Sequence, residues 1–540
     1  MRLNLSNVLG DRVTGQLARS LGVSSDGDSI SPELFGVMNE FAFSSTTPEE
    51  FSYWYLRAKC FSKFDDGDPS SEAARVTAAM DAFWDSEAHC SAVNERLVDP
   101  WTRHSIPQGV LRRARCLVSD VLAQFPWEKF PMACGFGPGA TTGLRRNESA
   151  QQNKWALSAH ITEKALPYHH AFARWCSVRI PTDLLIVDTN RVTTVPKDYR
   201  RDRTIAIEPD WNTFYQHGVG RLIRKRLNRV GLLLPTAQEH HARLAQLGSA
   251  NGSLATLDMS SASDTICLAL VEALLPEDWL RVVYDLRSEY PEVNGVRGPA
   301  YAKVSSMGNG FTFELETLLF FALTAAACGI GTLREFRLRG GTEVVSVYGD
   351  DIICPARHAE EVLGALQVFG FIPNADKSFW KGPFRESCGG HYFEGADVTP
   401  FYLKSHPGHV DDLIVLGNAA QSHVVRHSFE YECLAPTVRE CRSLTPRVLR
   451  GPWGQDGCMW SEWDECTPRW HPDYQAWEFQ RVQRKHKFAD VSDREGSYLF
   501  RLWVNGPDLQ ASLLAKALVK RTVVPAFACR ESWLMGLTVR

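Results

Sequence analysis

The segment Glu343–Pro355 constrains the fold of this chain most strongly. It reads EVVSVYGDDIICP, with apolar β-forming residues on both sides of a central Gly-Asp-Asp. This pattern predicts two antiparallel strands joined by a tight turn at Gly349. The turn would carry the adjacent carboxylates of Asp350 and Asp351 at its tip. Because neighbouring anions repel, such a pair is costly unless a cation lies beside it, and a hard divalent cation with oxygen ligands meets that need.

A second carboxylate site lies upstream of this predicted hairpin. The run LATLD ends at Asp258 and reads as a short buried strand that finishes in an acid. A strand-end carboxylate can meet a hairpin tip across neighbouring strands, and three carboxylates from two strands suit two divalent ions. That is the apparatus of in-line phosphoryl or nucleotidyl transfer. Asp264 follows, just before a helix expected from the apolar stripe at Leu268, Val271 and Leu274, where it is either part of the site or a helix N-terminal acid.

A small polar loop at residues 303–312 separates the two acidic sites. It reads KVSSMGNGFT, and its glycines allow close backbone approach to a ligand, while Asn309 offers both a donor and an acceptor. A helix cap is the alternative interpretation of this loop. An apolar window at Thr317–Leu333 follows, slightly too short to span a membrane, and it predicts a buried core helix.

The net charge of −4, from 59 basic and 63 acidic residues, does not indicate a globally basic nucleic-acid binder. The charge is uneven, however. The first 100 residues hold 16 acidic and 8 basic side chains, whereas Arg191–Val230 holds ten basic and four acidic ones. This basic stretch is either the solvated face of an amphipathic helix or a surface for phosphates, and the sequence alone leaves both open.

Two further features have weaker meanings. The loop Gly135–Ala140 fits the dinucleotide-binding pattern GxGxxA, but Pro138 and the lack of a strand–loop–helix frame favour a simple turn. Five tryptophans lie between residues 453 and 477. They suit stacking on nucleic-acid bases or packing of an irregular, loop-rich region, and packing is the expectation here.

The order of the three central motifs resembles a known family. LDMSSASD, SSMGNGFTFE and YGDD are similar to palm motifs A, B and C of RNA-directed RNA polymerases, closest to the replicase catalytic subunit of positive-strand RNA bacteriophages, the leviviruses. Segments 195–212, 370–379 and 382–404 are similar to the same group. The resemblance runs over about residues 190 to 405 and is thin at both ends of the chain.

The resemblance implies an α+β fold, the right hand of fingers, palm and thumb, with an antiparallel sheet and helices in the palm. The implied division is an N-terminal segment at 1–105, mostly helical and partly supporting the palm, fingers at 106–250, palm at 251–400, and a thumb and C-terminal region at 401–540. The implied function is template-directed RNA synthesis from RNA, replicating a phage genome.

The resemblance also implies roles for individual residues. The ligands of two Mg²⁺ ions, with Mn²⁺ as a substitute, would be Asp258, Asp350 and Asp351. Lys377 would be a general acid toward pyrophosphate. Asp264 and Asn309 would bind the ribose and favour its 2′-hydroxyl, as RNA synthesis requires. The same pocket would be lined by Ser305, Ser306 and Gly308, and the triphosphate would be held by residues from the group Lys197, Arg200, Arg201 and Arg203.

The expected partners are RNA, nucleoside triphosphates, host elongation factors Tu and Ts and, in some members, ribosomal protein S1, in the cytoplasm of the bacterial host and without a membrane. A reverse transcriptase would use the same palm, but Asp264 in place of a bulky residue and Gly349 in the turn favour RNA synthesis. A non-catalytic RNA-binding protein would not need the three carboxylates.

Overall fold

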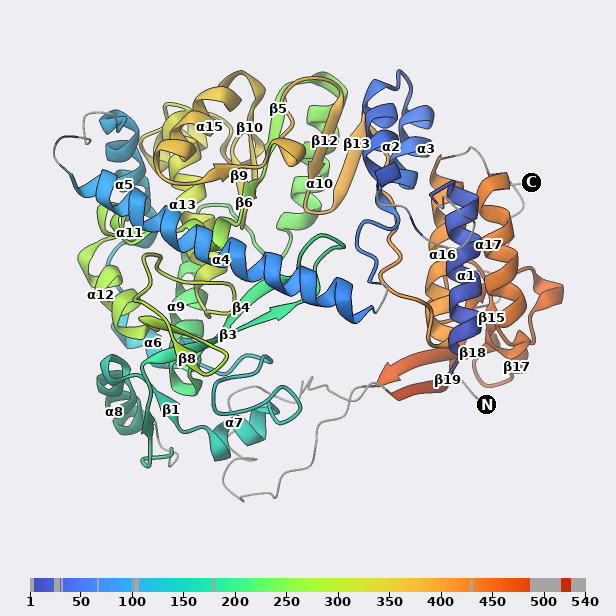
Figure 1. Ribbon diagram of the computed structural model, residues 1–540, viewed down its shortest axis with the longest axis horizontal. Helices are drawn as coiled ribbons and strands as arrows, with labels where there is room; N and C mark the ends of the chain where they lie inside the picture. Colours follow the sequence, from blue (N-terminus) through green and yellow to red (C-terminus); the bar gives the residue numbers. More distant parts are fainter. Residues whose placement is uncertain are drawn as a thin grey trace.

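The computed structural model describes residues 4–23, 30, 33–65, 68–99, 101, 106–176, 180–427, 431–485 and 516–525. Helices and small sheets are interleaved along the chain, so the predicted α+β class is confirmed (Figure 1). No described helix has the length and apolar character needed to cross a membrane.

A three-stranded antiparallel sheet lies at the centre, in the order β5 (Leu254–Leu257), β10 (Asp351–Pro355), β9 (Ser346–Tyr348). In β5 and β10, Leu257 lies opposite Ile352. The next position in this register places Asp258 opposite Asp351. The predicted strand and hairpin are therefore both present, and they meet at their acidic ends.

The hairpin turn is tight for a local reason. Asp351 pairs with Tyr348, which leaves only Gly349 and Asp350 between the strands. Gly349 has φ +61°, a conformation that glycine adopts without strain, and a Cβ there would lie 2.8 Å from the ring of Phe313. Its backbone N–H donates to Thr317 Oγ1 at 2.9 Å. The turn is thus fixed to the following long helix.

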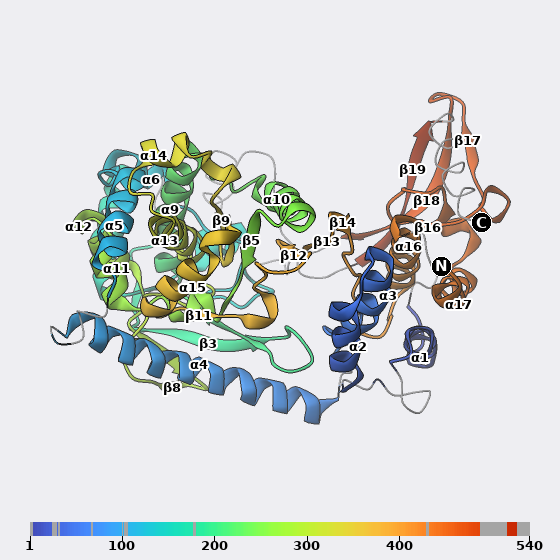
Figure 2. The ribbon, with the colours of Figure 1, turned by 90° about the horizontal axis from the view of Figure 1, so that it is seen from above.

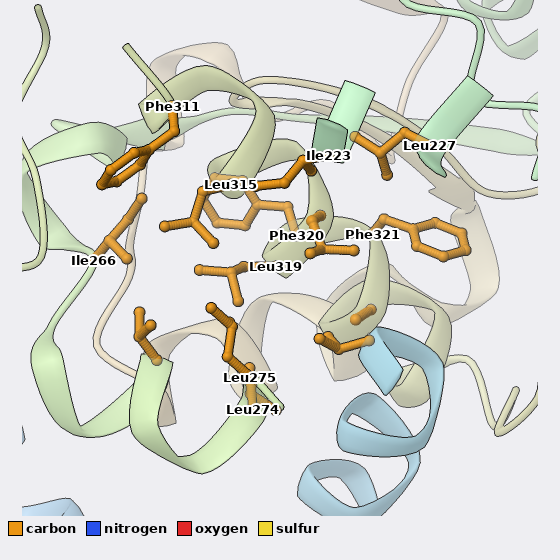
Figure 3. Close-up of a cluster of buried hydrophobic side chains, with 14 of the residues drawn as sticks. Ile223, Leu227, Ile266, Leu274, Leu275, Phe311, Leu315, Leu319, Phe320 and Phe321 are labelled. Carbon is orange, nitrogen blue, oxygen red and sulfur yellow. The ribbon is translucent and has the colours of Figure 1, made fainter. Parts of the chain in front are cut away.

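That helix, α13 (Thr312–Ala327), is buried on all sides and forms the core of the molecule. It packs against α5 (Gln108–Leu122), α9 (Asp210–Arg229) and α15 (Ala359–Val368). Figure 3 shows Leu315, Leu319 and Phe320 between residues of α9 and residues near α11 (Leu268–Leu274). The predicted core helix is confirmed, but it ends at Ala327 rather than continuing to Leu333, because Gly329 adopts φ +76° and breaks the helix.

The chain on both sides of β5 supplies helices and one four-stranded sheet in the order β4-β3-β7-β8. The strands of this sheet are β3 (Thr189–Val195), β4 (Arg203–Ile207), β7 (Tyr290–Val293) and β8 (Val296–Arg297). Two further short strands are β1 (His160–Ile161) and β2 (Leu185–Ile186). The remaining helices are α6 (Phe130–Ala133), α7 (Gln151–Leu157), α8 (Leu166–Trp175), α10 (Ala237–Asn251), α12 (Glu277–Leu286) and α14 (Leu333–Leu338). The long helix α4 (Pro69–Val98) crosses this body (Figure 1).

A second hydrophobic core joins the beginning of the chain to its end. Residues of α1 (Asn7–Leu21), such as Leu17, pack with Leu413 of α16 (Val410–His427) and Val438 of α17 (Tyr431–Leu444). In Figure 2 this group, with β18 (Ala476–Lys485) and β19 (Lys516–Pro525), lies apart from the body around α13, and α2 (Glu33–Ser44) and α3 (Pro48–Lys59) lie between them. The predicted N-terminal segment is therefore shared, because α4 belongs to the main body and α1 to the second core.

Short strands complete the connections around the central sheet and within the C-terminal part. They are β6 (Met259–Ser260), β11 (Ile372–Pro373), β12 (Phe384–Ser387), β13 (Gly390–Phe393), β14 (Ala396–Asp397), β15 (Arg450–Gly451), β16 (Met459–Trp460) and β17 (Arg469–His471).

The two weaker sequence features have structural roles. The carbonyl groups of Gly137 and Gly139 accept hydrogen bonds from the buried Lys154 ammonium, so this loop is occupied by the protein's own side chain. The tryptophan-rich segment packs on itself, with the rings of Trp453 and Trp460 4.4 Å apart and those of Trp470 and Trp477 5.1 Å apart. The expectation of packing for this segment agrees with these contacts.

Candidate active site

A cavity of about 460 Å³ opens beside the acidic end of the central sheet. It brings together residues that are far apart in the sequence. The predicted site residues that line it are Lys197, Arg200, Arg201, Arg203, Asp258, Asp264, Asp350 and Lys377. The lining is therefore basic at the loop that carries Lys197 and Arg200 and acidic at the edge of the central sheet, and Lys377 lies close to the acidic residues.

A smaller cavity of about 250 Å³ shares this acidic edge. It is lined by Asp258, Asp350, Asp351 and Lys377 together with Lys63, Glu386, Gly389, His391 and Tyr402. The ammonium of Lys63 lies 3.7 Å from the centre of the Tyr402 ring. Asp258, Asp350 and Lys377 thus line both cavities, whereas Asp351 lines only the smaller one.

The carboxylates at this edge hold protons more tightly than usual. Burial raises the pKa of Asp258 to about 7, and Asp350 and Asp351 add to the rise, while Lys377 opposes it. Burial likewise raises the pKa of Asp351 to about 6, with a further contribution from Asp350. The negative charges of this edge are therefore only partly compensated by the protein itself.

The carboxylates are at present held by separate partners. Asn374 Nδ2 donates to Asp258 Oδ2 at 2.7 Å, while Ser387 Oγ and the Cys388 N–H donate to Asp351 Oδ1. In the described part of the chain, no three His, Cys, Asp or Glu side chains are grouped so that they could hold a metal ion as they stand. Carboxylate oxygen donors fit a hard divalent cation, but Asp258, Asp350 and Asp351 would have to turn toward one another to surround it.

Lys377 lies close enough to these acids to interact with their charges. It ends the short 3₁₀ helix Ala375–Lys377 and is exposed to the cavity. Burial lowers the pKa of Lys377, but the charges of Asp258, Glu386 and the two turn aspartates outweigh this effect and raise it. Lys377 therefore carries a proton at neutral pH.

The basic wall is formed by the loop between β3 and β4. The buried Arg75 of α4 holds this loop through Asp202, with 3.4 Å between Arg75 Nε and Asp202 Oδ1. Burial and the nearby Arg201 and Arg203 lower the pKa of Lys197. An anion would relieve the repulsion among these crowded cations, so this part of the basic stretch suits phosphate binding.

The second half of the basic stretch, on α9, has a different role. Arg224 forms an ion pair with Glu314, at 2.6 Å between Arg224 Nη2 and Glu314 Oε1, and Arg221 donates to the carbonyl of Ala133. These side chains tie α9 to its neighbours. The amphipathic-helix interpretation describes this half, because its basic side chains are mostly exposed while Leu222, Ile223 and Leu227 are buried. Phosphate binding by the first half stays a prediction.

The glycine-bearing loop lies beside the cavity but lines it only through Met307. Gly308 has φ +114°, and a Cβ there would lie 2.2 Å from the carbonyl oxygen of Ala206 in β4, so only glycine fits. The structure does not bring Ser305, Ser306, Gly308 or Asn309 into the lining of this cavity, because the loop packs against β4. Among the described residues, Ser305 Oγ, Ser306 Oγ and Asn309 Nδ2 are buried without a hydrogen-bond partner.

Sequence reasoning missed a buried ion cluster around Asp264. Lys303 Nζ lies 2.9 Å from Asp264 Oδ1 and 3.0 Å from Glu87 Oε1, and the Lys303 side chain is 1% exposed. The two negative charges raise the pKa of Lys303 in spite of its burial, which lowers it. No local sequence pattern predicts this cluster, because Glu87 comes from α4, far away in the sequence.

Glu316 was also missed. It lies within the apolar helix α13, it is buried, and burial together with the charge of Asp350 raises its pKa well above the usual value. The available signal was a pair of acids, Glu314 and Glu316, at the start of an otherwise apolar helix.

Comparisons with known proteins identify the family. Residues 6–461 match the family model described as RNA replicase, beta-chain. The chain is 37% identical over 474 residues to the RNA-directed RNA polymerase subunit beta of Qbeta virus (strain MX1), covering 85% of this chain and 77% of that protein. It is 35% identical to the RNA-directed RNA polymerase beta chain of Enterobacteria phage fr, covering 78% of each, and 40% identical to the subunit beta of Enterobacteria phage SP, covering 69% of this chain and 64% of that one.

Among solved structures, the RNA-dependent RNA polymerase of a human picorbirnavirus is similar, with 12% identity, a TM-score of 0.37 and coverage of 68% of this chain and 74% of that one. The matched replicases make RNA from RNA, so the alternatives of a reverse transcriptase, a non-catalytic RNA-binding protein and a dinucleotide enzyme are set aside. The chain belongs to the RNA replicase beta-chain family and is an RNA-directed RNA polymerase that replicates an RNA phage genome.

Proposed function

We propose that the 460 Å³ cavity binds the incoming ribonucleoside triphosphate of this polymerase and that Asp258, Asp350 and Asp351 bind its divalent ions. The observation that carries the proposal is the composition of the cavity, whose lining combines a basic loop with the acidic sheet edge. A triphosphate needs clustered cations along its phosphates and a metal at its reacting end. RNA template and nucleoside triphosphates are the partners that family membership implies.

Divalent metal use follows from membership in a polymerase family, and two Mg²⁺ ions, replaceable by Mn²⁺, are the proposed form. When bound, such ions lower the pKa of the primer 3′-hydroxyl and neutralise charge on the triphosphate. The donors proposed for them are Asp258, Asp350 and Asp351. Burial raises the pKa of Asp258 and of Asp351, and neighbouring acids raise both further. The protein's own contribution is to hold these carboxylates at adjoining strand ends.

The basic loop and Lys377 act on the phosphates. We assign triphosphate binding to Lys197, Arg200, Arg201 and Arg203, which line the cavity. Lys377 carries a proton beside Asp258 and Asp350, because their charges raise its pKa. It is therefore proposed as the general acid that donates a proton to the departing pyrophosphate.

Asp264 and Asn309 are proposed to recognise the ribose. The ion pair with Lys303 engages Asp264 Oδ1 and fixes the side chain at the cavity wall. The unpartnered Nδ2 of Asn309, together with the hydroxyls of Ser305 and Ser306, would gain partners if the loop moved toward a bound nucleotide. Such a movement would bring the loop residues into the pocket, as the family resemblance implies.

Replacement of Asp264 by alanine is expected to reduce the preference for ribonucleotides over 2′-deoxyribonucleotides by about tenfold or more, since a hydrogen bond to a charged group is worth about 1.5–3 kcal/mol. The measurement is the ratio of kcat/KM for one ribonucleotide and its 2′-deoxy form on the same RNA template. Lys303 keeps its pairing with Glu87 in this variant. The matched control is Asp376→Ala, which removes another carboxylate from the same cavity; an unchanged ratio in D264A would refute the ribose role.

The parts of the hand are proposed as an N-terminal segment at 1–105, fingers at 106–250, palm at 251–400 and a thumb with the C-terminal region at 401–540. Residues 486–515 and 526–540 of the last part lie outside the described residues.

The proposed setting is the cytoplasm of the bacterial host, with elongation factors Tu and Ts and ribosomal protein S1 as partners. Purified chain should copy phage RNA faster after these factors are added, and an unchanged rate would speak against them.

A further inference from the structure

A chain of hydrogen bonds runs from the carboxylate of Asp351 into the protein interior. Asp351 Oδ1 accepts from Ser387 Oγ at 3.2 Å and from the Cys388 N–H at 3.1 Å. Ser387 Oγ lies 3.0 Å from His241 Nδ1, and His241 Nε2 lies 2.9 Å from Ser346 Oγ. The chain thus links β10, the end of β12, helix α10 and β9, which are four elements that surround the acidic sheet edge.

The interior members of this chain are closed off from solvent. Ser387, His241 and Ser346 are 1%, 0% and 3% exposed. Burial, with the neighbouring His240, lowers the pKa of His241 to about 3, so its ring is neutral and carries a single N–H. Each buried polar atom therefore depends on its neighbour in the chain for a hydrogen bond.

The number of donors gives the chain one direction. An ionised carboxylate can only accept hydrogen bonds, so the Ser387 hydroxyl must donate its one proton to Asp351. Ser387 must then accept from His241, which assigns the ring proton to Nδ1 and leaves Nε2 to accept from Ser346. Every proton in the chain thus points toward Asp351.

This arrangement fixes one oxygen of Asp351. Oδ1 receives donors from Ser387 Oγ and the Cys388 N–H, and the Cys388 thiol also hydrogen-bonds to this carboxylate. Resting on the assignment of Asp351 as a metal ligand, we propose that His241, acting through Ser387, is a positioning residue that orients the Asp351 carboxylate for the divalent ion. An apolar residue of similar volume could fill the space of His241, but it could not fix the direction of the Ser387 hydroxyl.

The experiment compares Mn²⁺ dissociation constants, measured by electron paramagnetic resonance on the purified full-length chain. Partners of metal-binding side chains typically contribute about 10–100-fold to metal affinity. We expect Ser387→Ala and His241→Leu each to weaken Mn²⁺ binding by about tenfold and to raise the Mg²⁺ concentration for half-maximal nucleotide incorporation in parallel. His241→Asn should stay within about threefold of the unchanged protein, because its amide can donate from the place of Nδ1.

The matched control is His240→Leu, which removes the adjacent histidine of α10, whose ring contacts the Thr342 carbonyl instead of Ser387. It should leave the Mn²⁺ dissociation constant unchanged. Melting temperatures in the presence of a chelator separate a loss of folding from a loss of metal affinity. If His241→Leu does not fold, Ser387→Ala decides alone, because it removes only one oxygen atom.

The outcomes separate this inference from the function on which it rests. If Asp351→Asn binds Mn²⁺ and makes RNA as the unchanged protein does, the assignment of Asp351 as a ligand is wrong. If Asp351→Asn loses both but folded Ser387→Ala and His241→Leu keep unchanged Mn²⁺ affinity, the positioning role is overturned. Equal weakening in His241→Asn and His241→Leu would also overturn it, since the direction of the chain would then not matter.

Discussion

Replacing Asp350 by asparagine is expected to abolish nucleotide incorporation, by at least about a thousandfold, while RNA binding stays within about twofold. A thousandfold loss corresponds to about 4 kcal/mol of transition-state stabilisation, which is within reach of a metal-ligand carboxylate. Asparagine keeps the size of the side chain, and the Gly349 turn that carries it is fixed by Thr317. RNA binding is preserved because removal of a negative charge cannot weaken contacts with phosphate.

The two activities are measured separately for this variant, as incorporation of a labelled ribonucleotide and as fluorescence anisotropy of labelled RNA at one fixed salt concentration. Asp376→Asn provides the control, since Asp376 is an exposed carboxylate in the lining of the same cavity. Loss of activity in both variants would indicate a general effect of charge. Mg²⁺-dependent synthesis by the Asp350→Asn variant would contradict the assignment of the acidic sheet edge.

Replacing Lys303 by methionine should destabilise the protein by about 3–5 kcal/mol, the usual cost of leaving buried charges without their partner. Lys303 is enclosed by Asp264, Glu87 and the ring of Phe83, whose centre lies 3.9 Å from the ammonium. Methionine keeps most of the chain length but leaves two carboxylates, which are 11% and 14% exposed, next to each other without a cation. The measurement is thermal or urea unfolding in a metal-free buffer.

Two further variants make this prediction specific. Adding Glu87→Gln to Lys303→Met removes one of the two carboxylate charges that lack a partner, so part of the lost stability should be recovered. The glutamine can still accept a hydrogen bond from the Ala302 N–H. Lys164→Met breaks a mostly exposed pair with Glu289 and should cost less than about 1 kcal/mol. Equal losses of stability in Lys303→Met and Lys164→Met would show that the buried cluster stabilises the protein no more than an exposed ion pair does.

The elements that the sequence predicted correctly are those whose signal is local. The hairpin at Gly349, the strand ending before Asp258 and the apolar core helix each follow from a short run of residues and its periodicity. The helix end was wrong because the apolar run continues past Cys328, while the backbone turns at Gly329. Hydrophobicity alone does not report such a turn.

The contacts that support the site could not be predicted in this way. Glu87, His241 and Arg75 reach it from α4 and α10, and their partners lie between about 100 and 220 residues away along the chain. Whether these residues form such contacts depends on which helices pack beside the sheet, and one sequence without relatives does not contain that information. The same reason explains why the shared core of α1, α16 and α17 was not foreseen.

The most direct test of the account asks where the metal lies along the chain. Ferrous iron in place of Mg²⁺, with ascorbate and peroxide, produces hydroxyl radicals that cut the backbone near the bound ion. We expect backbone cuts beside Asp258 and beside Asp350 and Asp351. Excess Mg²⁺ should suppress these cuts, and they should be lost in Asp350→Asn. Cuts elsewhere in the chain, or the same cuts in Asp350→Asn, would contradict the proposal that these three carboxylates form the metal site.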